Sequence, residues 1–254
     1  MLNSFVPRKI LGVIPARYAS SRFPGKALAR LHSKSMLQHV WERASGSRYL
    51  THLIIATDDG RIYQEARRFG ADVRMTREDH LSGTDRVAEV ASASDAELIV
   101  NIQGDEPLID PEAIDAAILP LAHEPAILMG TLKKKIEDPS EAGNPNVVKV
   151  VTDRFENALF FSRSTIPYRR EGVFEHFKHI GLYVYSRNFL LGYSDLPVGP
   201  LESAERLEQL RALENGYKIR VVPTEYESLG VDTPEDLERV SQLYDRSLAY
   251  IRNG

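Results

Sequence analysis

Near its start the chain reads ILGVIPARYASSRFPGK over residues 10–26, an apolar run that continues into a basic loop. Residues 10–16 have the composition of a buried strand. The stretch also contains two prolines, which stiffen the loop, and three cations, which are Arg17, Arg22 and Lys26. A connecting turn needs no such cations, whereas guanidinium and ammonium groups suit phosphate oxygens. From this stretch alone, a phosphate site and a solvated basic loop are equally good interpretations.

The same succession of apolar strand, polar loop and helical pattern repeats along the first hundred residues. Further strands are predicted at residues 53–56, 72–76 and 98–102, and helices at 37–44, 61–69 and 84–93. Gly70 is placed to end the second of these helices. Strand, loop and helix in this alternation predict a parallel sheet with helices on both faces, which is an α/β fold.

The region from about 126 to 186 has a different pattern, which is typical of antiparallel strands. The strands are predicted at 146–152, 158–162 and 180–185. After this region the α/β pattern resumes with a helix around Leu207, Leu210, Leu213 and a stop at Gly216, a strand at 219–222 and a terminal helix at 233–250. With no repeat and no long linker, the sequence predicts a single domain over residues 1–254 with a β-rich lobe at about 126–186.

Composition excludes several classes of function. The chain has 254 residues and a formal net charge of -4, whereas general nucleic-acid binders have a basic excess, so we expect no nucleic-acid partner. Cysteine is absent, which excludes disulfides, thiolate metal sites and a cysteine nucleophile. No apolar run approaches the roughly 18 residues that a membrane span needs. We therefore expect no membrane partner and a cytoplasmic location.

Two aspartates stand in loops that follow predicted strands, where ligands bind in open α/β sheets. Asp105 lies in QGDEP (103–107), and Asp232 lies in VDTPED (231–236). Magnesium is usually held by one or two carboxylates together with substrate phosphates. On its own motif Asp105 is more simply a turn or capping residue, although Asp110 already precedes a helix start. The capping box that begins at Thr233 leaves Asp232 without a structural explanation. A second carboxylate there could complete a metal site.

A third loop, HLSGTDR at residues 80–86, precedes a predicted helix. Ser82, Gly83 and Thr84 could present amides and hydroxyls to a base or an anion. The alternative is a plain N-cap at Thr84. The chain has no G-x-G-x-x-G, no Walker spacing and no G-x-S-x-G, so a nicotinamide oxidoreductase, a P-loop site and a hydrolase triad are all unsupported.

The order of nine blocks along the chain carries a family likeness. The blocks are PARYASSRFPGK (15–26), ATDD (56–59), MTREDHLSGTDR (75–86), NIQGDEP (101–107), NPNVVKVV (144–151), FFSRSTIPY (160–168), HIGLYVYS (179–186), LEQLRALE (207–214) and GVDTPEDL (230–237). They are spread along nearly the whole chain, from residue 15 to residue 237. In their order and spacing the chain closely resembles the 3-deoxy-manno-octulosonate (Kdo) cytidylyltransferases, also called CMP-Kdo synthetases.

The resemblance implies a Rossmann-like nucleotide-diphospho-sugar transferase fold, with a mixed, mostly parallel sheet and a homodimer formed partly through the β-rich region. It also implies a Mg²⁺-dependent reaction in which CTP and Kdo, an eight-carbon acidic sugar, give CMP-Kdo and pyrophosphate for lipopolysaccharide biosynthesis. The sugar's anomeric hydroxyl would attack the α-phosphate in line. Catalysis of such a transfer consists mostly of positioning the reactants and neutralising their charge, which needs no protein nucleophile.

The resemblance also implies roles for individual residues. Arg17, Arg22 and Lys26 would bind the triphosphate, and Asp105 and Asp232 would hold magnesium; of these, Arg17, Lys26, Asp105 and Asp232 would be catalytic. The remaining substrate contacts would lie by the nucleotide (Ala16, Arg77, Ser82, Gly83, Thr84) and by the sugar (Gln103, Arg163, His179, Tyr183, Glu208, Gln209).

Three stretches depart from the family pattern. Ala27 stands where proline is common, residues 227–230 replace a Gly-x-Gly turn, and LESAER (201–206) lacks apolar residues that are frequent there. The last two lie near the implied sugar side, so the 8-amino-3,8-dideoxy sugar is an alternative substrate. A non-catalytic nucleotide-binding protein on the same fold is a further alternative, against which the presence of both Asp105 and Asp232 argues.

Overall fold

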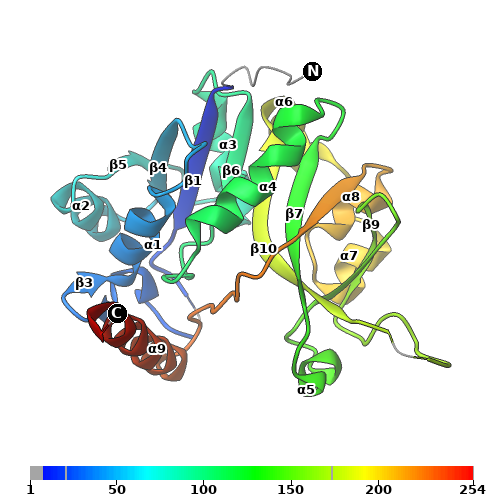
Figure 1. Cartoon of the computed structure of the whole chain (residues 1–254). Helices are drawn as coiled ribbons and strands as arrows, with labels where there is room; N and C mark the ends of the chain where they lie inside the picture. Colours follow the sequence, from blue (N-terminus) through cyan, green and yellow to red (C-terminus); the bar gives the residue numbers. More distant parts are fainter. Residues whose placement is uncertain (1–7, 21, 173, 254) are drawn as a thin grey trace, which may run out of the picture. The chain divides into compact units, whose positions relative to one another are not determined.

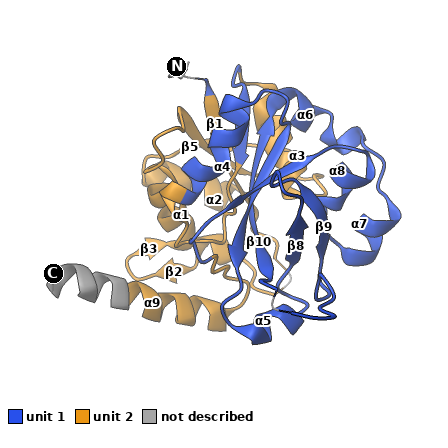
Figure 2. Ribbon diagram, turned by 45° about the vertical axis from the view of Figure 1, so that its right-hand side comes forward, with its two compact units in different colours: residues 1–9, 95–100, 113–227 blue, residues 10–94, 101–112, 228–254 orange. Residues whose placement is uncertain are grey.

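The computed structural model describes residues 8–20, 22–172 and 174–253, with side chains as far as residue 245 (Figure 1). Its internal contacts divide the chain into two compact units (Figure 2). Unit 1 holds the chain up to Lys9 together with Asp95–Val100 and Ala113–Glu227. Unit 2 holds Ile10–Ser94, Asn101–Glu112 and Ser228–Gly254.

Unit 2 is built on the parallel strands β1 (Ile10–Ala16), β4 (His52–Thr57) and β5 (Asp72–Met75). β1 pairs with β4, and β4 pairs with β5. The helices α1 (Met36–Ala44), α2 (Gly60–Arg68) and α3 (Gly83–Ser92) pack against these strands. Because parallel strands run in one direction, the loops that follow β1 and β4 leave from the same edge of the sheet.

Unit 2 also contains smaller elements and the C-terminal helix, which pack together. They are the 3₁₀ turn η1 (Lys26–Leu28), the hairpin strands β2 (Arg30–Leu31) and β3 (Lys34–Ser35), and the terminal helix α9 (Pro234–Asn253). Val231 and Val240 are fully buried against Leu31 and Met36. The start of α9 is a capping box, since Asp236 N donates to Thr233 Oγ1 and Thr233 N donates to Asp236 Oδ2. This confirms the predicted helix start.

Unit 1 contains mixed strand pairings. Its strands are β6 (Leu98–Asn101, whose last residue belongs to unit 2), β7 (Met129–Lys135), β8 (Lys149–Thr152), β9 (Ala158–Ser162), β10 (Phe177–Ser186) and β11 (Ile219–Pro223). β10 lies between β6 and β7 and is antiparallel to β7, whereas β11 is parallel to β7. β8 is antiparallel to both β9 and β10.

Short helices complete unit 1. They are α4 (Pro111–His123, which begins in unit 2), α5 (Pro139–Gly143), α6 (Arg187–Leu191), the 3₁₀ turn η2 (Tyr193–Asp195), α7 (Pro200–Glu205) and α8 (Leu210–Glu214). Fully buried apolar side chains from the strands and from α8, such as Leu132, Val184, Leu210 and Val221, form its core.

The predicted α/β fold is confirmed, with differences in the second half of the chain. β1 and β9 have the predicted bounds, but β7 and several short helices were not predicted. The strand predicted at 146–152 begins only at Lys149, because Asn146 N donates to the Asn144 side chain and turns the chain there. Leu207 precedes α8 instead of belonging to it. A single domain with a β-rich lobe stays a prediction.

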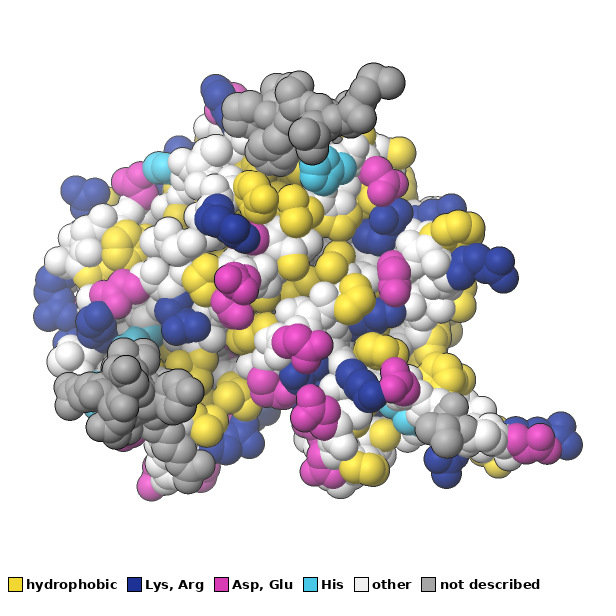
Figure 3. Space-filling view, viewed as in Figure 1, with side chains coloured by type: hydrophobic (Ala, Val, Ile, Leu, Met, Phe, Trp, Pro, Cys, Tyr) yellow, Lys and Arg dark blue, Asp and Glu magenta, His cyan; other side chains and the backbone are white. Residues whose placement is uncertain are grey.

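The surface bears charges of both signs. On the face shown in Figure 3, basic and acidic side chains are intermixed, in keeping with the small net charge. Within residues 8–20, 22–172 and 174–253, no helix is long and apolar enough to cross a membrane.

Candidate active site

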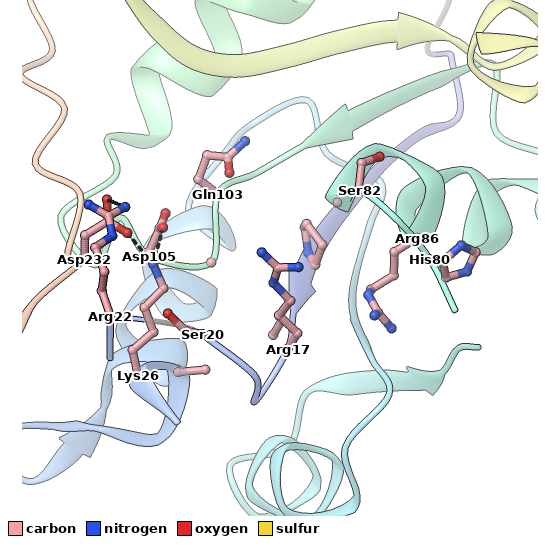
Figure 4. A pocket seen from close by; sticks show the side chains of 15 residues that line it. Arg17, Ser20, Arg22, Lys26, His80, Ser82, Arg86, Gln103, Asp105 and Asp232 are labelled. Atoms are coloured by element: carbon pink, nitrogen blue, oxygen red, sulfur yellow. Dashed lines mark hydrogen bonds and ion pairs between the residues drawn. The ribbon is translucent and has the colours of Figure 1, made fainter. Parts of the chain in front are cut away.

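A cavity of about 310 Å³ lies in unit 2, where the loops after β1 and β6 meet the segment before α9 (Figure 4). Ile102 N donates to Val13 O, which places the chain after β6 beside β1. Gly104 is required there, because a Cβ on it would lie 2.8 Å from Pro15 O. Nine residues predicted from the sequence line the cavity: Ala16, Arg17, Arg22, Lys26, Ser82, Gly83, Gln103, Asp105 and Asp232.

Two carboxylates converge on one ammonium group in this cavity. Lys26 Nζ donates to Asp105 Oδ2 at 2.7 Å and to Asp232 Oδ1 at 3.0 Å, as Figure 4 shows. It also donates to Val231 O at 3.1 Å. The backbone fixes both acids, since Val231 N donates to Asp105 O at 2.9 Å. The two aspartates, 127 positions apart by their residue numbers, therefore face a common point.

The charge of Lys26 is stabilised by this arrangement. Its side chain is only 17% exposed, and burial by itself lowers the pKa of an ammonium group. The opposing effect of Asp105 and Asp232 is larger, so the pKa of Lys26 is raised above its ordinary value. Lys26 is therefore positively charged at neutral pH.

The other two cations of the loop after β1 differ in their partners. Arg22 pairs with the second oxygen of Asp232 at 2.8 Å. Among the side chains described, no acidic group pairs with Arg17, and Figure 4 shows its guanidinium standing by itself within the cavity. Arg17 is thus available to an anionic ligand.

The shape of this loop depends on a tight turn. Gly25 N donates to Tyr18 O at 2.9 Å, and Gly25 has a φ of 72°, which favours glycine. The Arg61 guanidinium lies 3.3 Å from the centre of the Tyr18 ring. These contacts close the loop and set where η1, and with it Lys26, begins.

The start of α3 lines another part of the cavity. Ser82 is the N-cap, and its hydroxyl accepts from Asp85 N while Asp85 accepts from Ser82 N. The alternative of an N-cap at Thr84 is therefore wrong. Ser82 competes better for the cap because Asp85, three positions on, completes the reciprocal pair. Thr84 is buried and does not line the cavity.

Arg77 is not brought into the cavity. Its side chain is 70% exposed and lies 3.3 Å from Asp79, and its backbone N donates to Glu89. The structure therefore places Arg77 beyond the cavity lining, although the resemblance implied a position by the cytosine.

Sequence reasoning gave no role to Arg86 and Asp58, which the structure joins. Arg86 is 4% exposed, lines the cavity, and its Nη2 lies 2.5 Å from Asp58 Oδ2. Its Nη1 donates to Thr76 Oγ1. Asp58 directly follows β4, so the strand-end argument that selected Asp105 could also have found it. His80, hydrogen-bonded to Glu89, lines the cavity as well.

Five residues implied for the sugar lie in unit 1: Arg163, His179, Tyr183, Glu208 and Gln209. His179 and Tyr183 are four positions apart on β10, and their ring centres are 5.4 Å apart. His179 Nε2 lies 2.9 Å from Thr131 Oγ1. Arg163 donates to the backbone oxygens of Glu205 and Pro145. Gln209 is nearly buried, and Glu208 O accepts from Tyr193.

The surroundings of His179 make stability depend on pH. Desolvation lowers the pKa of His179 from 6.5 to about 3, so between these values the unfolded chain binds the proton that the folded one does not. The contribution of His179 to the free energy of unfolding is fully present above pH 6.5. It is lost as pH falls toward 3, by up to about 1.4 kcal/mol per pH unit.

We expect His179→Gln to flatten the slope of unfolding free energy against pH between 6.5 and 5 in urea titrations, because glutamine does not bind a proton in either state. Equal slopes in the two proteins would contradict this.

The donor set at Asp105 and Asp232 fits a hard divalent cation. Carboxylate oxygens are the ligands that magnesium prefers, and one or two of them suffice when substrate phosphates supply the rest. Among the described side chains, no group of three or more acidic or histidine residues is arranged to hold a metal ion alone. The converging pair would therefore need oxygens from a ligand to complete a coordination shell.

Comparisons with known proteins found a matching family model, close relatives and a similar solved structure. A family model described as Cytidylyltransferase matches residues 11–219. A 3-deoxy-manno-octulosonate cytidylyltransferase of Solibacter usitatus is 71% identical over 245 residues, covering 96% of this chain and 97% of the relative. The protein of the same description from Syntrophotalea carbinolica is 57% identical, covering 91% and 96%. A solved structure of CMP:2-keto-3-deoxy-manno-octonic acid synthetase complexed with CTP has a TM-score of 0.91 and 43% identity, covering 94% of this chain and 99% of its own.

Proposed function

The chain belongs to the 3-deoxy-manno-octulosonate cytidylyltransferase family, and from this premise we propose that it activates Kdo by the reaction CTP + Kdo → CMP-Kdo + pyrophosphate. The observation that carries the proposal is the convergence of Asp105 and Asp232 beside three cations in one cavity. Carboxylates for a metal and cations for a triphosphate are the two charge requirements of nucleotidyl transfer. The product would serve lipopolysaccharide biosynthesis in the cytoplasm, where CTP is available.

In the proposed reaction the anomeric hydroxyl oxygen of the sugar forms a bond to the α-phosphorus, and the bond from that phosphorus to the β-phosphate oxygen breaks. The hydroxyl proton passes to solvent water, and pyrophosphate departs in line. Arg17 and Arg22 hold the triphosphate and stabilise the negative charge of the leaving group. Lys26 contributes a point charge to the same phosphates. Gln103, which lines the cavity from the loop after β6, would face the sugar.

A divalent cation is expected from the class of reaction, and we propose Mg²⁺ held by Asp105 and Asp232. When bound, it neutralises charge on the α-phosphate and lowers the pKa of the attacking hydroxyl. The two carboxylates would hold the cation, and the hydrogen bond from Val231 N to Asp105 O supports this role because it ties their two segments together.

For the base, we propose the N-terminus of α3. The first N–H groups of a helix have no intrahelical acceptor, and the carbonyl of cytosine is an acceptor. The start of α3 lies close to β1, since a Cβ on Gly83 would be in ordinary contact with the Pro15 ring at 3.6 Å. Ser82 and Gly83 line the cavity, whereas Thr84 would contribute only its backbone.

For the sugar, we propose the remaining side chains of the family pattern, Arg163, His179, Tyr183, Glu208 and Gln209. A carboxylate and several hydroxyls on the sugar require a cation and hydrogen-bonding groups, which these side chains supply. His179 is neutral in this role because its pKa is about 3.

The direct test is pyrophosphate release from CTP and Kdo with Mg²⁺, using purified folded protein. We expect turnover that requires both substrates and stops when EDTA removes the metal. The same assay with 8-amino-3,8-dideoxy-manno-octulosonate gives kcat/KM for the second sugar. A larger kcat/KM for the amino sugar than for Kdo would show that the amino sugar is the preferred substrate. Binding of CTP without any pyrophosphate release would favour the non-catalytic alternative.

We further propose that the two units act as one nucleotidyltransferase domain and that the chain forms a homodimer through its β-rich region. Large apolar side chains are exposed along this region, namely Phe155, Leu159, Tyr168 and Phe174. Exposed apolar side chains that lie together mark association surfaces, and we propose that these four contribute to one.

We therefore expect the wild type to sediment as a dimer and Phe155→Glu/Leu159→Glu to sediment near the 28.6 kDa of one chain. Charged side chains at these positions would have to be desolvated in the interface. Val198→Glu is the matched control, because Val198 is also exposed but lies outside residues 126–186. A monomeric wild type, or a dimer that both changes leave intact, would contradict the proposal.

A further inference from the structure

The hydrogen-bonding capacity of Lys26 is fully used in this structure. Its ammonium group has three N–H donors, and its three acceptors are Asp105 Oδ2, Val231 O and Asp232 Oδ1. The side chain is largely buried, and Figure 4 shows its nitrogen directed toward both carboxylates. Lys26 therefore cannot donate to a phosphate without giving up one of these acceptors.

The same ammonium lies at the point where the two carboxylates converge. A divalent cation bound by Asp105 and Asp232 together would need that position and would be repelled by the positive charge of Lys26. Arg22 pairs with the other oxygen of Asp232, so the two negative charges already have two positive partners. An added cation gains little attraction until Lys26 moves away.

The side chain of Lys26 can move while its backbone stays in place. Its backbone begins η1 and is held there, since Lys26 N donates to Phe23 O and Leu28 N donates to Gly25 O. The four-carbon stem of lysine can carry the ammonium from one acceptor set to another while the backbone stays in place. A triphosphate beside Arg17 would offer several anionic oxygens in exchange for the two carboxylates.

We propose that Lys26 occupies the cation position between Asp105 and Asp232 in the free protein, and that the nucleotide triphosphate draws it away so that the divalent cation enters with the nucleotide. This inference rests on the proposed function, because it assumes that the cavity receives a nucleoside triphosphate and a metal. Since coupling between two ligands is reciprocal, the exchange makes binding of nucleotide and metal cooperative. It also keeps the metal from binding before the nucleotide does.

The first arm of the test measures Mn²⁺ binding alone, from the electron paramagnetic resonance signal of free Mn²⁺ without nucleotide or sugar. We expect Lys26→Met to bind Mn²⁺ at least about tenfold more tightly than the wild type, within the usual range of coupling between sites. Lys26→Gln serves as a second uncharged variant if the methionine variant does not fold. Adding Asp105→Asn to either variant is expected to remove the gain.

The matched control is Arg17→Met, which removes a charge of the same sign from the same cavity without touching either carboxylate. It is expected to change Mn²⁺ affinity by less than about threefold, as an effect of general electrostatics that salt screens. If it tightens Mn²⁺ as much as Lys26→Met, or if neither Lys26 variant tightens Mn²⁺, displacement by Lys26 is overturned.

The second arm measures metal-free CTP binding by calorimetry in EDTA. We expect Lys26→Met to weaken it, because the ammonium that moves to the phosphates is missing. Unchanged CTP affinity would overturn the exchange. Both arms are independent of turnover: a wild type that releases pyrophosphate while Lys26→Met leaves Mn²⁺ affinity unchanged refutes only this inference. A wild type that releases none refutes the proposed function.

Discussion

Replacing Asp105 with Asn is expected to lower kcat by roughly 10²–10³-fold, the size seen when one preorganised electrostatic contact to a transition state is lost. Asparagine keeps the size and shape of the side chain but removes the negative charge that would hold the metal at the α-phosphate. Asp232→Asn is expected to behave in the same way, since both carboxylates face one point. Steady-state pyrophosphate release with saturating CTP and Kdo measures the effect.

Both variants are expected to unfold within a few degrees of the wild type. Asp105 and Asp232 are 30% and 44% exposed, and ion pairs with that much solvent contact contribute about 1 kcal/mol or less. Asp110→Asn is the matched control for Asp105→Asn, because Asp110 lies in the same loop, accepts from Glu112 N at the start of α4 and is not among the residues that line the cavity. Its turnover is expected to equal that of the wild type. A normal rate in Asp105→Asn or Asp232→Asn would remove that residue from the proposed metal site.

Removing Asp58 is expected to produce the largest loss of stability. In Asp58→Ala the guanidinium of Arg86, 4% exposed, would keep its charge without its carboxylate partner. Breaking a buried pair in this way costs about 3–5 kcal/mol, which corresponds to a fall in Tm of roughly 6–20 °C for a chain of this size. Thermal unfolding followed by circular dichroism measures the change, and the KM for CTP is expected to rise because Arg86 lines the cavity.

Asp79→Ala provides the control for this prediction. Asp79 also pairs with an arginine, Arg77, at 3.3 Å, but both side chains are at least 70% exposed. Its loss is expected to change stability by less than about 1 kcal/mol. The double variant Asp58→Leu/Arg86→Met, which leaves no unpaired charge, is expected to be more stable than Asp58→Ala. Equal stability of Asp58→Ala and Asp79→Ala would contradict the buried pair.

Local pattern was sufficient for many elements and for part of the site. The unbroken apolar run of β1 predicted its bounds, and the spacing of Thr233 and Asp236 predicted the start of α9. Strand-end positions also pointed to Arg17, Lys26 and Asp105 as site residues, because the carboxyl ends of neighbouring parallel strands share one edge. These features depend on residues close together in the sequence, whose periodicity records which face is buried.

The sequence pattern was insufficient where two neighbouring residues could both cap a helix, or where a strand lacks a regular alternation of apolar and polar residues. Ser82 and Thr84 can both cap a helix. Ser82 is the N-cap because its hydroxyl accepts from Asp85 N while the Asp85 carboxylate accepts from Ser82 N. β7 carries three consecutive lysines, Lys133 to Lys135, which conceal a strand that is mostly buried. Two of these ammonium groups are buried only because partners such as Glu156 and the Glu225 carbonyl reach them from other segments.

The sequence by itself therefore determined the α/β fold, the family and the set of charged residues at the strand ends. Only the tertiary structure decided how those charges are paired. It placed Lys26 between Asp105 and Asp232, which are 79 and 206 positions away, and it joined Arg86 to Asp58 while leaving Arg77 at the surface. The physical reason is that the period of apolar residues, which predicts burial, depends on residues that are close in the sequence. An ion pair depends instead on the distance between two side chains, and packing of segments remote in the sequence sets that distance.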